Sequence, residues 1–188
     1  MKHFLLITLF IPLVGFCQIP EFIITDVSNI EPIIVEVKDN SSSVLFTKTL
    51  EWLNLTFKNP EKVIKGNVDS DFIRFSGFKS SFAKRKIMGS LFYYDFEYTI
   101  RIDFKEGKYR FSLEEYAIIS PSISPELSKS TLEFYKRPEC LNKKGELKDA
   151  YVEFYKIFSE GILIELNSLN TSLFDYLTGK TKETKDNW

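Results

Sequence analysis

Residues 92–113, FYYDFEYTIRIDFKEGKYRFSL, decide the fold. From Phe92 to Phe104 every second residue is aromatic or aliphatic, and the alternation resumes at Tyr109. This strict alternation predicts long strands with one apolar face and one solvated face. The short polar connection between the two runs contains Gly107, which supplies the positive φ of a tight turn. The segment is therefore predicted to be a β-hairpin.

The alternation also sets the register of this hairpin. If Phe104 and Tyr109 share the inner face, Asp103 lies opposite Arg110 on the solvated face. Such an exposed pair of opposite charges is worth about 0.2–1 kcal/mol, which supports the register. After the hairpin the alternation changes phase. A β-bulge at Glu114-Glu115 would return the next apolar residues to the inner face.

The first 17 residues have the three-part layout of a secretory signal peptide. Residues 1–3 are a short basic segment, residues 4–16 are apolar, and Cys17 precedes the expected cleavage site. The apolar run is shorter than the ~20 residues that span a membrane. A lipoprotein signal would make Cys17 the lipidated residue, but it needs a small residue where Phe16 stands, so cleavage after Cys17 is favoured. We expect an exported chain of residues 18–188, periplasmic or secreted and not membrane-spanning.

Loss of this segment limits the chemistry that the chain can support. The only histidine, His3, and one of the two cysteines leave with it. Histidine is the commonest general base and metal ligand, so the mature chain can assemble neither a Ser-His-Asp triad nor an ordinary zinc site. We expect no cofactor and no metal. The remaining thiol, Cys140, either joins two chains or is buried and inert.

The charge balance gives no reason to expect nucleic acid as a partner. Of 25 basic residues one, Lys2, lies in the predicted signal peptide, and 26 acidic residues leave the mature chain with a net charge of −2. A near-neutral chain has no overall attraction to nucleic acid or to an anionic membrane. The length and a hydrophobic content of 44% suit one domain with one core.

Local signals predict the other elements. A helix should begin after the N-cap candidates at 40–43, bury a stripe of Phe46, Leu50, Leu53 and Phe57, and end before Pro60. The remaining predicted elements are a strand at 33–37, strands at 62–68 and 72–78, a long loop at 120–147 with a short helix within 128–136, and a C-terminal helix at about 148–178.

This order, β-α-β-β-β-β-α, predicts an α+β fold like that of the TATA-binding protein (TBP-like), with an antiparallel sheet of about five strands and helices on one face. Three segments carry a resemblance to a family: LEWL at 50–53, VI at 63–64 and YTIRIDFKEGKYR at 98–110. The chain resembles the domain of unknown function 4468 family, a bacterial family of exported domains. The resemblance implies a single TBP-like domain over 18–188 with its core at about 33–118, and no catalytic residue.

Two basic or aromatic groups are candidates for an interaction surface. The run Lys84, Arg85 and Lys86, expected in a connection between strands, could bind phosphate or an acidic glycan, although charge runs are more often solvated loops. Phe134 and Tyr135 lie in the long loop, where function often resides. Apolar residues there more often pin a loop to its own domain.

Carboxylates and one exposed aromatic residue are the other candidates. Glu114 and Glu115, with Asp95 and Glu97 on the neighbouring strand, could hold a cation or act as an acid/base pair, but only if the bulge is real. The alternating aromatic stripe could line a ligand cavity, although such a stripe is usually core. Tyr93 is the one aromatic residue of that strand on the polar side.

These features favour a non-catalytic binding or interaction module of the cell envelope, with an envelope protein or glycan as partner. The first alternative is a carboxylate-dependent hydrolase of envelope glycans, which needs two carboxyl groups about 5–10 Å apart in a cleft. The second is a carrier of an apolar ligand, which needs a cavity of a few hundred Å³. Nucleic-acid binding does not follow from the fold, because fold does not determine function.

Overall fold

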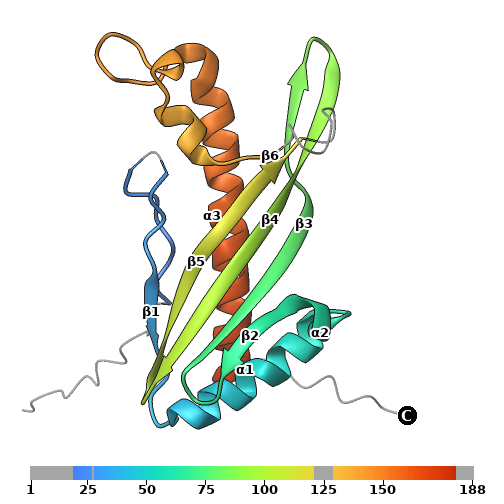
Figure 1. The fold of residues 1–188 in the computed structure, drawn as a ribbon, viewed down its shortest axis with the longest axis vertical. Helices are drawn as coiled ribbons and strands as arrows, with labels where there is room; N and C mark the ends of the chain where they lie inside the picture. Colours follow the sequence, from blue (N-terminus) through green and yellow to red (C-terminus); the bar gives the residue numbers. More distant parts are fainter. Residues whose placement is uncertain (1–18, 27, 121–128, 181–188) are drawn as a thin grey trace, which may run out of the picture.

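The computed structural model describes residues 19–26, 28–120 and 129–180, so the predicted signal peptide and parts of the long loop and C-terminal tail lie outside the described residues. Figure 1 shows the fold. In chain order the elements are β1 (Ile33–Glu36), α1 (Ser42–Thr56), α2 (Pro60–Val63), β2 (Ile64–Val68), β3 (Phe72–Ile87), β4 (Ser90–Lys105), β5 (Lys108–Ile119), β6 (Lys129–Ser130), the 3-10 helices η1 (Leu132–Lys136) and η2 (Pro138–Cys140), and α3 (Asp149–Leu177).

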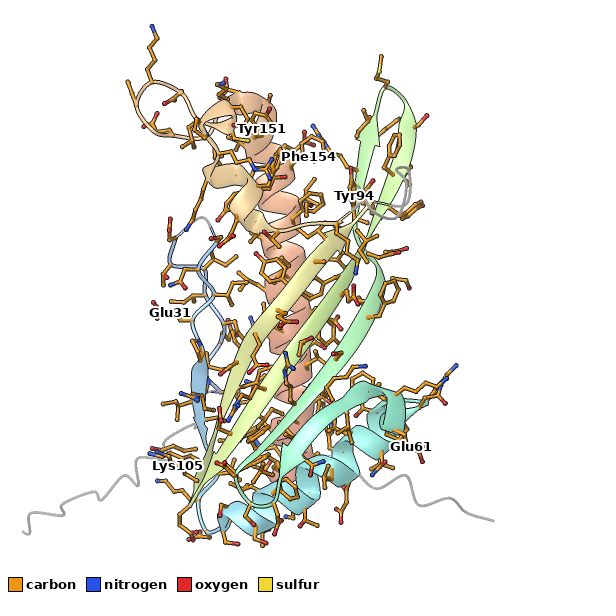
Figure 2. The ribbon with its side chains drawn as sticks, viewed as in Figure 1. Glu31, Glu61, Tyr94, Lys105, Tyr151 and Phe154 are labelled. Atoms are coloured by element: carbon orange, nitrogen blue, oxygen red, sulfur yellow. The ribbon has the colours of Figure 1, made fainter. Side chains whose placement is uncertain are left out.

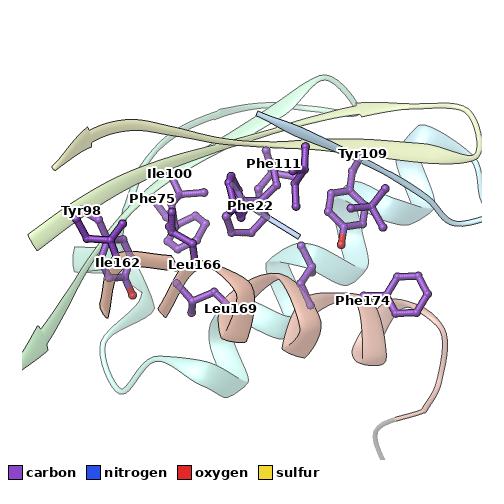
Figure 3. Close-up of a cluster of buried hydrophobic side chains, with 14 of the residues drawn as sticks. Phe22, Phe75, Tyr98, Ile100, Tyr109, Phe111, Ile162, Leu166, Leu169 and Phe174 are labelled. Carbon is purple, nitrogen blue, oxygen red and sulfur yellow. The ribbon is translucent and has the colours of Figure 1, made fainter. Parts of the chain in front are cut away.

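The strands form one antiparallel sheet in the order β1-β5-β4-β3-β2, and β6 pairs with the end of β5. The two long helices, α1 and α3, cover the same face of this sheet (Figures 1 and 3). The predicted α+β, TBP-like arrangement is therefore confirmed. The short strand β6 and the short helix α2 are additions to the predicted order.

The β4–β5 hairpin has the predicted register. Lys105 lies opposite Lys108, and Asp103 lies opposite Arg110. Arg110 Nη2 is 2.8 Å from Asp103 Oδ2, so the expected ion pair forms on the solvated face. Gly107 takes a φ of 71° in the turn. Alternation and charge were enough to predict this hairpin because all of its determinants are local.

The predicted bulge in β5 is also present. Ile100 pairs with Leu113, whereas the preceding residue of β4 pairs with Glu115, so Glu114 is an extra residue in β5. The extra residue restores the inward direction of the next apolar side chains. Ile118, which follows the bulge, is buried as a result.

Two predicted strands have different bounds in the structure. The strand predicted at 72–78 continues to Ile87 as β3, which pairs with β4 almost to its end. An irregularity between Lys79 and Ala83 breaks the alternation there, and so the sequence suggested a loop. The strand predicted from residue 62 begins at Ile64, because Pro60 occupies the first turn of α2, where its missing N–H costs nothing.

The helices bury apolar faces against the sheet. In α1, Ser41 is the N-cap, and the buried face includes Leu45 and Trp52 as well as Leu53, so it is rotated from the predicted stripe. α3 matches the helix predicted at 148–178, and Gly179 follows it with a φ of 69°. No helix within the described ranges is long and apolar enough to cross a membrane.

The core lies between the inner face of the sheet and α3, as Figure 3 shows. Ile100 and Phe111 from the sheet meet Leu166 from α3, and all three side chains are fully buried. Phe22, from the segment before β1, packs with its ring centre 5.5 Å from that of Phe111. The aromatic stripe of β4 is thus the inner wall of the sheet.

Candidate functional site

The end of the β3–β4 hairpin projects past the rest of the sheet (Figure 1). β5 reaches only as far as Asp95 of β4, and β2 reaches only as far as Phe75 of β3. Residues 83–94, which we call the hairpin arm, therefore pair only with each other among the described strands. A two-stranded ribbon is marginally stable on its own, so the arm depends on packing of one face.

The outer face of the hairpin arm combines basic and apolar side chains. Lys84 lies opposite Tyr93, and Lys86 lies opposite Leu91. The side chains of Tyr93 and Leu91 are 45% and 50% exposed, and Met88 at the turn is wholly exposed. Contiguous exposed apolar side chains rimmed by polar residues mark interaction sites on proteins. This outer face is the candidate functional site.

The turn of the arm holds Met88 in an unfavourable conformation. Met88 and Gly89 form the two-residue connection with φ values of 47° and 87°. Two positive φ values are typical of a type I′ turn, whose first position favours Asn, Asp or Gly. A residue such as methionine costs roughly 1 kcal/mol there. The hairpin therefore carries a strained residue whose side chain makes no buried contact.

The inner face of the arm is fixed to α3 (Figure 2). The Tyr94 ring lies 4.8 Å from that of Phe158, edge to face. The guanidinium carbon of Arg85 lies 3.3 Å from the centre of the Phe154 ring. Arg85 Nη2 also contacts a carboxylate oxygen of Glu153 at 2.8 Å. These contacts hold one face of the arm while the other faces solvent.

The stacking of Arg85 on the Phe154 ring should stabilise the arm more than the ion pair of Arg85 with Glu153 does. Glu153 is 63% exposed, so its pair with Arg85 is worth less than about 1 kcal/mol. Arg85 is only 17% exposed, and a desolvated cation–π contact is worth about 2 kcal/mol. We expect Glu153→Ala to lower the free energy of unfolding by about 0.5 kcal/mol and Arg85→Ala by about 1–2 kcal/mol. Urea denaturation measures both, and equal losses would show that the ion pair dominates.

The structure separates the predicted basic run. It lies within β3 rather than in a connection, because β3 is longer than predicted. Lys84 and Lys86 alternate onto the outer face with Tyr93, whereas Arg85 turns inward to α3. Strand alternation accounts for this split.

Phe134 and Tyr135 lie away from the outer face of the arm. Both belong to η1, and the Tyr135 ring packs 5.6 Å from that of Tyr155 on α3. Tyr135 is buried, and burial raises the pKa of its hydroxyl above the ordinary value. It therefore cannot form part of an exposed surface as predicted. Cys140 is also fully buried, which agrees with the inert-thiol alternative.

The candidate carboxylates all have partners. The bulge does bring Glu114 and Glu115 together, but both contact the guanidinium of Arg74. Asp95 accepts a hydrogen bond from a backbone amide, and Glu97 pairs with a lysine of β6. No group of three or more His, Cys, Asp or Glu side chains in the described part of the chain could hold a metal ion. Glu97 and Glu115 line one cleft of about 200 Å³, and each of them is paired with a basic side chain.

A polar cleft lies beside α3. It has a volume of about 790 Å³ and is lined by Ile19, Pro20, Glu21, Asn167, Asn170, Thr171 and Lys180. Asn170 is buried at its base, where it accepts a hydrogen bond from the Tyr109 hydroxyl at 2.8 Å. An apolar ligand would need an apolar cavity between sheet and helices, and this cleft is not one.

Sequence reasoning missed Met88, Leu91 and Phe154 as parts of the site. The first two were missed because residues 79–91 were interpreted as a connection. The sequence did contain a signal for this hairpin. A glycine, Gly89, follows Met88 between two strand-like segments, a pattern that predicts a hairpin with a two-residue turn. The contact with Phe154 joins elements 69 positions apart and has no local signal.

The model of the family described as "Domain of unknown function (DUF4468) with TBP-like fold" matches residues 33–118. Over these residues the chain is similar to the DUF4468 family. The matched region runs from β1 almost to the end of β5 and contains the whole hairpin arm. The segment that fixes the arm, α3, follows it.

Two crystal structures resemble the chain. A DUF4468 family protein from Bacteroides ovatus is 15% identical with a TM-score of 0.61, and the alignment covers 83% of this chain and 90% of that one. A TBP-like protein from Parabacteroides distasonis is 14% identical with a TM-score of 0.55, covering 82% and 95%. At these identities the likeness establishes the fold alone. None of the curated proteins matches the chain.

Proposed function

We propose that the protein is a non-catalytic binding module of the cell envelope, exported by residues 1–17, whose binding surface is the outer face of the hairpin arm. One observation carries the proposal. Met88, Leu91 and Tyr93 expose apolar surface beside Lys84 and Lys86, on an element whose other face is fixed. A surface held in place before binding loses less conformational entropy when a partner docks.

The rest of the outer sheet face also exposes the apolar side chains of Ile34, Val68 and Phe78, but the arginines beside them are paired. Arg101 and Arg110 both contact Asp103, and Arg74 contacts the two bulge carboxylates. This face therefore presents charges that are already matched. Lys84 and Lys86, in contrast, have no ionic partner among the described residues. Matched charges on the sheet also support the proposal that nucleic acid is not the partner, because arginines engaged with carboxylates are poor phosphate ligands.

The proposal can be tested with a pair of leucine variants. Leu91 lies on the arm, and Leu55, on α1, is 74% exposed and far from the arm in sequence. Leu91→Asp places a charge in the proposed contact, whereas Leu55→Asp makes the same chemical change elsewhere. Each variant is added to washed envelopes of the native cell, and the sedimented fraction is measured.

We expect Leu91→Asp to lower envelope binding about tenfold, which corresponds to the loss of one half-buried leucine and the cost of burying a charge. Leu55→Asp should bind as the unchanged chain does. If both variants sediment like the unchanged chain, the arm is not the binding surface. Circular dichroism of both variants confirms that they fold.

A further inference from the structure

Two protrusions reach the same end of the molecule. In Figure 1 the turn of the hairpin arm and the loop before α3 both lie at the upper end of the long axis. We call residues 141–147 the basic loop; its ends are joined by a bridge between Leu141 and Leu147. Asn142 Oδ1 accepts hydrogen bonds from two backbone amides of the loop, which orders its turn. Both protrusions are thus defined structures that can meet one surface together.

The basic loop adds positive charge to this end. Lys143 and Lys144 are exposed at its tip, and neither has an ionic partner among the described residues. The acidic residue of the loop, Glu146, accepts a hydrogen bond from the Asn142 side chain at 3.1 Å. Together with Lys84 and Lys86 on the arm, these lysines give this end a local positive charge, although the net charge of the whole chain is slightly negative.

The side chains of the arm are ordered by distance from its turn. Met88 is at the turn, the Leu91–Lys86 pair comes next, and the Tyr93–Lys84 pair follows. At about 3.3 Å per strand residue, the second pair lies about 7 Å behind the first. In a lipid interface apolar residues enter the acyl boundary to about 5–10 Å, while lysine and tyrosine lie at the headgroups. The order along the arm is the order that such an interface requires.

We infer that this end of the protein docks on the flat surface of an anionic phospholipid bilayer, with Met88 and Leu91 inserted and Lys84, Lys86, Lys143 and Lys144 at the headgroups. The inference rests on the proposed function and names its partner. Two protrusions that end at one level suit a planar surface, and unpaired lysines complement anionic headgroups. Each such lysine is expected to strengthen binding about fivefold.

Vesicles without protein test the inference. The chain of residues 18–188 is used, because the apolar run at residues 4–16 would itself bind lipid. We expect binding to vesicles of mixed phosphatidylglycerol and phosphatidylcholine to be at least about tenfold stronger than to phosphatidylcholine alone, and to weaken as salt is added. Equal or absent binding to the two vesicle types would overturn the inference.

Paired charge reversals test the geometry. Lys143→Glu with Lys144→Glu alters the basic loop, whereas Lys105→Glu with Lys108→Glu makes the same change at the turn at the opposite end (Figure 2). We expect the first variant to lose at least about tenfold in binding to anionic vesicles and the second to lose less than about twofold. Equal losses would show a response to overall charge and would contradict docking by this end.

A fluorescent label reports insertion directly. Met88→Cys gives an exposed thiol, and the buried Cys140 is shielded from the same reagent. An environment-sensitive dye at position 88 should shift to shorter wavelength with anionic vesicles. An unchanged spectrum while the protein is bound would contradict insertion of the turn.

The envelope and vesicle experiments separate the two proposals. If vesicles are not bound but envelope binding still depends on Leu91, the lipid inference is wrong and a protein or glycan occupies the arm. If Leu91→Asp changes neither measurement, both the proposed function and the lipid inference are wrong.

Discussion

Raising the pH above 10 is expected to destabilise the protein steeply. Tyr98, Tyr109 and Tyr135 are buried, and burial raises the pKa of each hydroxyl above the ordinary value of 10.0. Above about pH 10 the unfolded chain releases these protons while the folded chain keeps them. Their contribution to stability is therefore complete below pH 10 and is lost as the pH rises toward the folded-state pKa values. In this range each tyrosine lowers the free energy of unfolding by about 1.4 kcal/mol per pH unit. The three together therefore lower it by about 4 kcal/mol per pH unit.

Urea denaturation at a series of pH values measures this slope. Tyr109→Phe should reduce the slope above pH 10 by about 1.4 kcal/mol per pH unit, because one titrating group with a raised pKa is removed. It also removes the hydrogen bond to Asn170, which should cost about 1–2 kcal/mol at neutral pH. Phe111→Leu is the matched control: it weakens the same core but carries no hydroxyl, so it should leave the slope unchanged. A stability that stays constant from pH 10 to 11 would contradict the burial of these tyrosines.

Replacement of Gly77 by alanine is expected to lower the free energy of unfolding by about 2–3 kcal/mol. Gly77 lies opposite Tyr98 across β3 and β4, and the tyrosine ring crosses over it. A Cβ at position 77 would lie 2.3 Å from Tyr98 Cζ, far inside van der Waals contact. Tyr98 is itself buried, so its ring cannot move away without disturbing the core.

Gly66 provides the control for this substitution. It is also a strand glycine, but no atom lies within 4 Å of a Cβ built there. Gly66→Ala should be neutral or stabilise by about 0.5 kcal/mol, because alanine has less conformational freedom to lose. In the Gly77→Ala background, Tyr98→Ala should cost less than it does alone, since the clash is removed. Equal effects of the two glycine substitutions would show that the ring does not cover Gly77.

Features that depend on contacts between residues close in sequence were predicted, whereas features that depend on other contacts were not. The register of the β4–β5 hairpin depends on alternation and on the Asp103–Arg110 pair, which are local, and both were predicted. The bulge at Glu114 was visible as a change of phase. The extension of β3 was not, because the irregularity from Lys79 to Ala83 hides the period of two.

The candidate site was predictable only in part. Lys84, Lys86 and Tyr93 were identified from charge and exposure, but their shared face depends on the pairing of β3 with β4. The ring on which Arg85 stacks belongs to α3, which lies outside the DUF4468 match. The arm and the basic loop reach the same end of the molecule because of the tertiary structure. The sequence of neither segment indicates this.

The conformation of Met88 offers a way to separate folding from binding. Asparagine is favoured at the first position of a type I′ turn, so Met88→Asn should raise the free energy of unfolding by about 0.5–1 kcal/mol. The same change removes the wholly exposed apolar side chain at the end of the arm. A substitution that stabilises the fold therefore removes part of the proposed contact.

The most direct test of the proposed binding surface is the envelope binding of the Met88→Asn chain, measured beside the unchanged chain. Binding through the arm predicts a several-fold lower sedimented fraction for a protein that is at least as stable. An undiminished sedimented fraction would contradict the assignment of the arm as the binding surface.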